Sequence, residues 1–205
     1  MKSIEAVTIY KDADRATVKR LTAGWSAEAG FALAAVILSV IGLASTHAAT
    51  FATLAAICLG VAVLFEGAAL GSCMLRFPKE RWQEGQRLEW SGGVIGKLVG
   101  GMVGIIVGVL VLSGTAAPTL LSLAVLVFGA AFLFTSMVSS VPGTQELSGA
   151  GAFVLGLLAV IGLHTPTLAL VALLGLGIIA ILNGVASERS MLIEHREHHV
   201  QHATP

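Results

Sequence analysis

The sequence has few charged residues and no surplus of either sign. Of its 205 residues, 12% are charged and 56% are hydrophobic, whereas a soluble domain carries about 25% charged residues. This composition excludes an ordinary soluble domain and predicts an all-α, polytopic membrane protein. Basic and acidic residues number 12 each, so the formal net charge is zero. No overall field therefore favours nucleic acid as a partner.

Cysteines and catalytic motifs are also scarce. The two cysteines, Cys58 and Cys73, lie too far apart on one apolar segment to form a disulfide with each other, and we interpret them as packing residues. The chain has no Walker A, GxSxG, HExxH or CxxC motif. Its glycines are plentiful within apolar runs but lack the strand–helix context of a nucleotide site. We therefore expect no enzymatic activity and no cofactor.

Long apolar runs, by contrast, are abundant. A helix needs about 20 residues to cross the hydrocarbon core, and six segments reach or approach that length: 27–46, 50–73, 93–113, 118–139, 148–164 and 166–186. The first follows a basic region, as in a signal peptide, but its late start and its length favour an uncleaved span. The fifth is the shortest and is interrupted by four glycines.

The six segments form three copies of one helical hairpin, at positions 39–67, 108–136 and 156–184. Alignment of the copies superposes Thr50 on Thr119, Gly60 on Gly129, and the Pro118-Thr119 pair on Pro166-Thr167. A hairpin of this kind cannot bury its packing face alone, so the repeat predicts an assembled six-helix bundle. Because every copy enters with the same orientation, we expect a pseudo-threefold axis along the membrane normal.

Basic residues gather on one side of the predicted spans. They precede the first span, occupy the connector at 74–92 and follow the last span, and none lies at the hairpin tips. The positive-inside rule then places both termini in the cytoplasm. The expected organisation is a cytoplasmic segment (1–26), a transmembrane domain (27–186, hairpins 27–73, 93–139 and 148–186) and a cytoplasmic tail (187–205). The polar, aromatic part of the connector fits an interfacial helix or a solvated linker equally well.

Glycine recurs at every fourth position of the third span, at Gly92, Gly96, Gly100, Gly104 and Gly108. Small residues let helix backbones approach closely in lipid, where no hydrophobic force drives helices together. The pattern predicts one glycine face against which another helix of the same chain packs. A seam between copies of the chain, or a helix lining a narrow path, is the alternative.

One carboxylate, Glu66, lies deep in a predicted span. The repeat aligns it with Thr135 and Asn183, and Lys97 enters the third span from the same side. Charges within spans usually face a bundle interior or a water-filled cavity. Two interpretations stay open. These residues form a polar ring in which Glu66 binds a proton or a cation, or Glu66 is protonated or paired with Lys97 and serves as interhelical glue.

Histidines occupy two further places. His47 and His164 coincide under the repeat at external hairpin tips, where imidazoles can titrate as that compartment acidifies, although ordinary polar tip residues are the commoner case. The tail carries His195, His198, His199 and His202, which would share one face of a helix and form a weak candidate metal site. We favour a solvated, disordered or frayed tail over a metal-binding or pH-responsive one.

The tandem hairpins resemble the HdeD-like family of small bacterial membrane proteins. The residues that carry the resemblance run from Gly104 through Pro118, Thr119, Leu120, Gly129 and Phe134, and from Gly156 through Pro166, Thr167, Leu168 and Gly177. The first copy departs from the pattern, with Ala49 in place of proline. The resemblance implies an inner-membrane protein associated with tolerance of acid stress, and it carries over no catalytic residue.

Three functions remain open on this basis. The first is a non-enzymatic inner-membrane protein that supports tolerance of acid or other envelope stress. The second is a small transporter or channel with a path near Glu66, Thr135 and Asn183. The third is an accessory subunit of a larger membrane complex, or a homo-oligomer. Each has the lipid bilayer as its first partner.

Overall fold

The structure is a computed structural model that describes residues 15–76, 84–115, 120–136 and 166–201, and residues 150, 151, 153, 154, 157 and 158 of the stretch between the last two ranges. Side chains are described over 23–72, 92–115, 120–133 and 166–182, and at 150, 151, 153, 154, 157, 158 and 185. Throughout these residues the only regular secondary structure is helical.

Five helices make up the described fold: α2 (Arg15–Ala44), α3 (Ala48–Arg76), α4 (Glu84–Leu112), α5 (Leu120–Ser136) and α7 (Pro166–Gln201). Three of them contain stretches long and apolar enough to cross a membrane, Ala23–Ala44, Ala48–Ser72 and Gly92–Leu112. The apolar stretches of α5 and α7, Leu120–Leu133 and Pro166–Leu182, are shorter. The prediction of an all-helical fold is confirmed for the described residues, and three of their helices could span a membrane; the six spans and the threefold repeat stay predictions.

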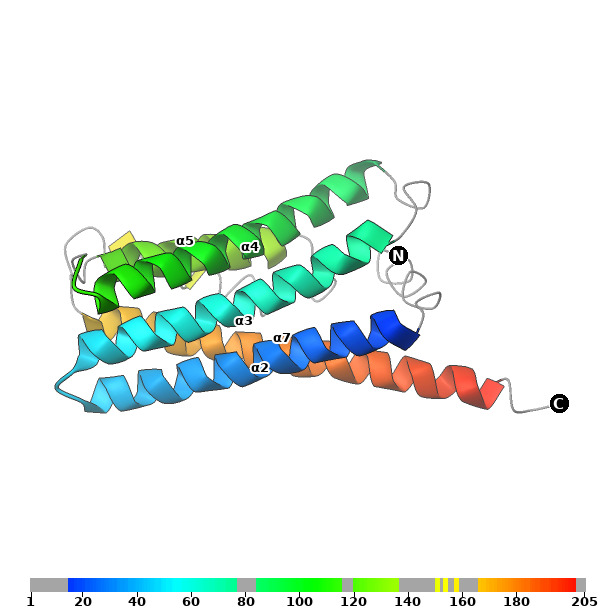
Figure 1. Ribbon diagram of the computed structural model, residues 1–205, viewed down its shortest axis with the longest axis horizontal. Helices are drawn as coiled ribbons and strands as arrows, with labels where there is room; N and C mark the ends of the chain where they lie inside the picture. The colour runs from blue at the N-terminus through cyan, green and yellow to red at the C-terminus, as the bar shows by residue number, and fades with distance from the viewer. Residues whose placement is uncertain are drawn as a thin grey trace.

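Helix α3 lies at the centre of the bundle. It packs against α2 on one side and α4 on the other, and it also contacts α5 and α7 (Figure 1). Helix α5 packs against α4, and α7 packs against α2. Figure 1 shows the start of α2 and the end of α7 at the same end of the bundle. The helices that bear Glu66 and Lys97 are therefore neighbours, and α3 separates α4 from α2.

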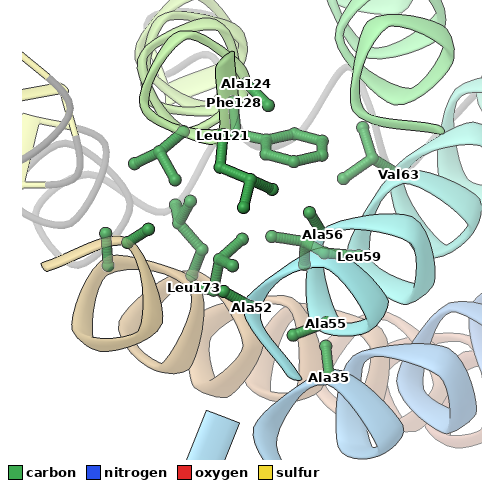
Figure 2. Close-up of a cluster of buried hydrophobic side chains, with 14 of the residues drawn as sticks. Ala35, Ala52, Ala55, Ala56, Leu59, Val63, Leu121, Ala124, Phe128 and Leu173 are labelled. Atoms are coloured by element: carbon green, nitrogen blue, oxygen red, sulfur yellow. The ribbon is translucent and has the colours of Figure 1, made fainter. Parts of the chain in front are cut away.

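The core is built from small and aliphatic side chains at the centre of this arrangement. Ala52, Ala55, Ala56 and Leu59 of α3 meet side chains of α2, α5 and α7 (Figure 2). By contrast, the outer faces expose large apolar side chains, such as Leu33, Ile95, Met102, Ile106 and Leu182, each 51–59% exposed. A soluble protein would bury many of these groups, whereas lipid tails solvate them, so the two-sided apolar character fits a bundle in a bilayer.

The helices are longer than the apolar runs predicted. Helix α2 begins at Arg15 rather than near residue 27, and α4 begins at Glu84 rather than near residue 93. Hydropathy reports how much of a helix is immersed in lipid, but backbone hydrogen bonds continue past that boundary into water. The end of the connector is therefore part of α4. Most of the predicted fifth span, 148–164, lies outside the described residues.

The C-terminal tail departs from the prediction in the same way. Helix α7 begins at Pro166, where the fixed φ of proline suits a first helical turn, as the sequence predicts. It continues without interruption to Gln201. The backbone of residues 187–201 is therefore helical, whereas the favoured interpretation was a solvated, disordered or frayed tail. The side chains of His195, His198 and His199 lie outside those the structure describes.

A short turn joins α2 to α3, and a second short turn terminates α4. Residues Ser45 to His47 link α2 to α3, and the His47 carbonyl accepts the first backbone hydrogen bonds of α3, from Thr50 and Phe51. Helix α4 ends in a Schellman motif. Gly114 adopts a φ of 73°, and the Thr115 amide donates to the carbonyl of Leu110. Only glycine adopts that backbone conformation without strain.

Candidate functional site: a buried charge cluster

Glu66 and Lys97 form an ion pair inside the bundle. The Lys97 ammonium donates a hydrogen bond to Glu66 Oε1, joining α4 to α3. Lys97 is only 2% exposed and Glu66 7%. The lysine therefore does not extend to the water interface. The second oxygen of Glu66, Oε2, is buried and makes no hydrogen bond with any residue the structure describes.

A third ionisable residue, Glu28, completes the cluster from α2. It is 1% exposed, and neither carboxyl oxygen has a hydrogen-bond partner among the described residues. Lys97 interacts electrostatically with it. Two carboxyl groups and one ammonium from three helices thus share one buried region. The three unpartnered carboxyl oxygens are unusual, because buried polar groups are nearly always hydrogen-bonded.

The sequence-based argument missed Glu28 because it lies near the beginning of the first apolar run. A signal was nevertheless present. Trp25, Glu28, Ala32, Ala35 and Ser39 are spaced alternately by three and four residues, which places them on one helix face. All five are buried in the structure. Because Glu28 shares a helix face with these residues, the spacing predicts that its side chain is buried, even though it lies close to the end of a span.

The pairing of the helices places Glu28, Glu66 and Lys97 at the same height along the bundle axis. Antiparallel packing of α2 on α3 sets Gly24 against Ala69 at one end and Gly42 against Phe51 at the other. This register places Glu28 beside the segment that carries Glu66. On the other side of α3, Gly67 faces Leu98 and the Cβ of Lys97. The absence of a side chain at Gly67 lets the lysine lie close against α3.

The α3–α4 contact that holds Lys97 is a seam of glycines opposed to aliphatic side chains. Along α3 the contacting residues are Ile57, Gly60, Leu64, Gly67 and Gly71, and along α4 they are Gly108, Ile105, Gly101, Leu98 and Val94. Each position pairs one glycine with one large residue of the opposite helix. Both sets are spaced alternately by three and four residues, the heptad spacing of two helices that supercoil around each other.

The backbones of α3 and α4 come closest at the middle of the seam. A Cβ added at Gly101 would lie 2.7 Å from the carbonyl oxygen of Gly60, and one added at Gly60 would lie 2.8 Å from the carbonyl oxygen of Gly101. The two backbones are therefore in direct contact at this point. Such approach through glycine is the usual basis of helix association in lipid. It leaves little room for water beside the neighbouring ion pair.

The predicted single glycine face of α4 is divided between two neighbours. Gly100 and Gly104 face Ala131 and Phe128 of α5, whereas Gly108 faces Ile57 of α3. A Cβ at Gly92 would meet no atom within 4 Å. The physical reason is the helical period, because a step of four residues overshoots a 3.6-residue turn by about 40°. Residues repeated every fourth position therefore wind around the helix, and Gly101, outside that series, makes the closest approach to the backbone of α3.

The remaining candidate residues are only partly covered by the structure. Thr135 and Asn183 lie in α5 and α7, but their side chains are outside the described set, so the polar ring stays a prediction. His47 is an exposed turn residue whose backbone amide donates to Ser45 Oγ. His164 and His202 lie outside the described residues. Among the side chains that are described, no three potential metal ligands gather at one place.

Comparison of the chain with protein-family models, with curated proteins and with solved structures finds no match. The functional argument therefore rests on the chemistry of the site. Lys97 and its two carboxyl partners can exchange a proton or re-pair, and all three side chains are almost fully buried. Buried charge of this kind is costly unless it is fully compensated, so the cluster is the chemically distinctive feature of the described bundle.

Proposed function

We propose that the protein is a non-enzymatic integral inner-membrane protein of the HdeD-like type that supports tolerance of acid or other envelope stress. The observation that carries the proposal is the enclosure of ionisable groups in a tightly packed bundle. Glu66 and Lys97 are almost fully buried beside a seam of direct backbone contacts. A role in packing calls for such a dry interior, whereas a transport path calls for water around Glu66.

The stress role is tested by acid survival of cells that lack the protein. Complementation with the wild-type chain is expected to restore survival. A Gly101→Leu variant, which forces α3 and α4 apart, is expected to fail even when it is inserted in the membrane. Glu66→Gln tests the polar site separately. Equal survival of cells with and without the protein would contradict the proposal.

The proposal includes six spans in three tandem hairpins with both termini in the cytoplasm. Support comes from the repeat in the sequence, from the basic residues at one side of the spans, and from the antiparallel pairing of α2 with α3 and α3 with α4. Single cysteines placed at Thr46 and Thr115 in a cysteine-free background are expected to react with a membrane-impermeant thiol reagent from outside intact cells. A cysteine at residue 2 is expected to react only after the cells are opened.

A small proton or cation transporter is the second candidate. Three buried carboxyl oxygens without partners favour it, because transport sites in membranes are built from such groups. Purified protein in liposomes loaded with a pH-sensitive dye distinguishes the two candidates. Dissipation of an imposed proton gradient that is lost in Glu66→Gln would favour transport, and gradients as stable as those of empty liposomes would favour the packing role.

Protein partners in addition to the lipid bilayer are also part of the proposal. The exposed apolar faces of α2 and α4 leave area for lipid, for a second copy of the chain or for a subunit of a membrane complex. The native mass of the protein extracted in mild detergent or polymer discs is expected to distinguish a monomer from a homo-oligomer or a complex.

A further inference from the structure

The buried cluster holds an odd number of ionisable groups. If all three were charged, two carboxylates and one ammonium would leave one net negative charge in the bundle interior. An isolated buried carboxylate is so unfavourable that the group normally takes up a proton instead. An ion pair is tolerated only where geometry and hydrogen bonds compensate it. The cluster therefore needs one further positive charge to be neutral.

The surroundings offer no other source of that charge among the described side chains. Helix α5 presents no titratable side chain over Leu120–Leu133, and α7 presents none over Pro166–Leu182. The other described titratable groups are Cys58, about two turns along α3 from Glu66, and His47, in the turn at the far end of that helix. Neither carries positive charge into the cluster from those positions.

We propose that Glu28, Glu66 and Lys97 form a binding site for a single proton, carried by Glu28 while Lys97 remains paired with Glu66. Glu66 Oε1 already accepts the hydrogen bond of Lys97, whereas both oxygens of Glu28 lack a partner. The proton therefore belongs on Glu28. The site is separate from the stress role proposed above, and it stands or falls without it.

A proton suits these residues better than a metal ion. Sodium and similar cations need several oxygen ligands, and the described cluster presents three unpartnered oxygens on two residues, next to an ammonium that repels a second cation. A proton needs only one of these oxygens. Lys97 also interacts with both carboxyl groups, so movement of its ammonium toward Glu28 would transfer the proton-binding role to Glu66. The bound proton would then pass from α2 to α3.

The test is the infrared absorption of protonated carboxyl groups in protein reconstituted in liposomes, recorded near neutral pH in choline buffer. The wild-type protein is expected to show a buried, protonated side-chain carboxyl band. Glu28→Gln, which keeps the shape of a neutral glutamic acid, is expected to lose that band. Glu66→Gln is expected to lose it as well, because Glu28 then ionises and pairs with Lys97. Lys97→Gln is expected to double it, since both carboxyl groups must then be neutral.

Glu28→Asp provides an assignment that does not depend on any of the amide variants folding. It is expected to shift the frequency of the band rather than remove it. Absence of the band from the wild-type protein would overturn the proposal, and so would an unchanged band in Glu28→Gln that has wild-type helix content. Loss of the wild-type band when sodium replaces choline would show that a metal cation fills the site, and would overturn it equally.

Discussion

The middle of the α3–α4 seam should be intolerant of a single added methyl group. In Gly101→Ala, the new Cβ would lie 2.7 Å from the carbonyl oxygen of Gly60, 2.7 Å from Leu64 Cγ and 3.0 Å from the backbone nitrogen of Leu64. Carbon atoms in favourable contact are separated by about 3.5–4.0 Å. Two of the three neighbours are backbone atoms that cannot rotate away, so the helices themselves must separate.

The size of the effect follows from that separation. A gap of about 0.5–1 Å already removes a quarter to a half of the dispersion attraction between facing atoms, and it would extend along the seam to the Lys97–Glu66 pair. We expect a loss of about 1–3 kcal/mol in the free energy of unfolding, the range typical of overpacked interiors. The measurement is unfolding by sodium dodecyl sulfate in mixed micelles, followed by far-ultraviolet circular dichroism.

Gly71→Ala is the matched control in the same seam. Its Cβ would lie 3.4 Å from Val94 Cγ1, an ordinary contact that needs no movement of either helix. Its stability is expected to equal that of the wild type or to exceed it slightly, because alanine favours the helix over glycine by up to about 1 kcal/mol. A Gly101→Ala variant as stable as the wild type, or a control equally damaged, would refute the packing argument.

Three other variants test separate parts of the bundle. Gly104→Ala forces the ring of Phe128 to move and should cost about 1–3 kcal/mol, and adding Phe128→Leu should recover most of it in the same unfolding assay. Lys97→Met should cost about 3–5 kcal/mol at neutral pH, because the buried carboxylate of Glu66 loses its cation and must take up a proton. This loss should shrink as pH falls, since the folded variant then binds more protons than the unfolded chain; a pH-independent loss would contradict it. His47→Ala keeps the backbone bonds of its exposed turn and should change stability by no more than about 0.5 kcal/mol, and a larger loss would show that the imidazole has a partner.

The buried cluster shows which residues of the candidate site could be predicted from the sequence and which could not. Glu66 and Lys97 stood out because each is a charge inside an apolar run, and entry from the same side made their pairing one of two open interpretations. Glu28 did not stand out, because it lies where the first apolar run begins. Whether a residue near the end of a span is buried depends on which helix covers it, and hydropathy contains no information on that point.

For the glycines of α4, too, the sequence predicted one property and only the structure decided another. Their number in the third span predicted close helix packing, and Gly100, Gly104 and Gly108 of α4 do lie against α5 and α3. Their spacing was read as a single face, but a four-residue step drifts around a 3.6-residue helix. The structure therefore distributes them between α3 and α5, and Gly101, outside the series, supplies the closest contact between the backbones of α3 and α4.

By itself, the sequence determined that the described residues are helical, that several of the helices suit a membrane, and that the two helices joined by the short turn at Ser45–His47 run antiparallel. These properties follow from local composition and spacing, because a backbone in lipid must satisfy its hydrogen bonds within each helix. Tertiary structure alone decided which helix faces meet, where each helix extends beyond its apolar run, and that Glu28 joins Glu66 and Lys97. Those features depend on the rotation and register of three helices at once, which residue spacing along any one of them does not specify.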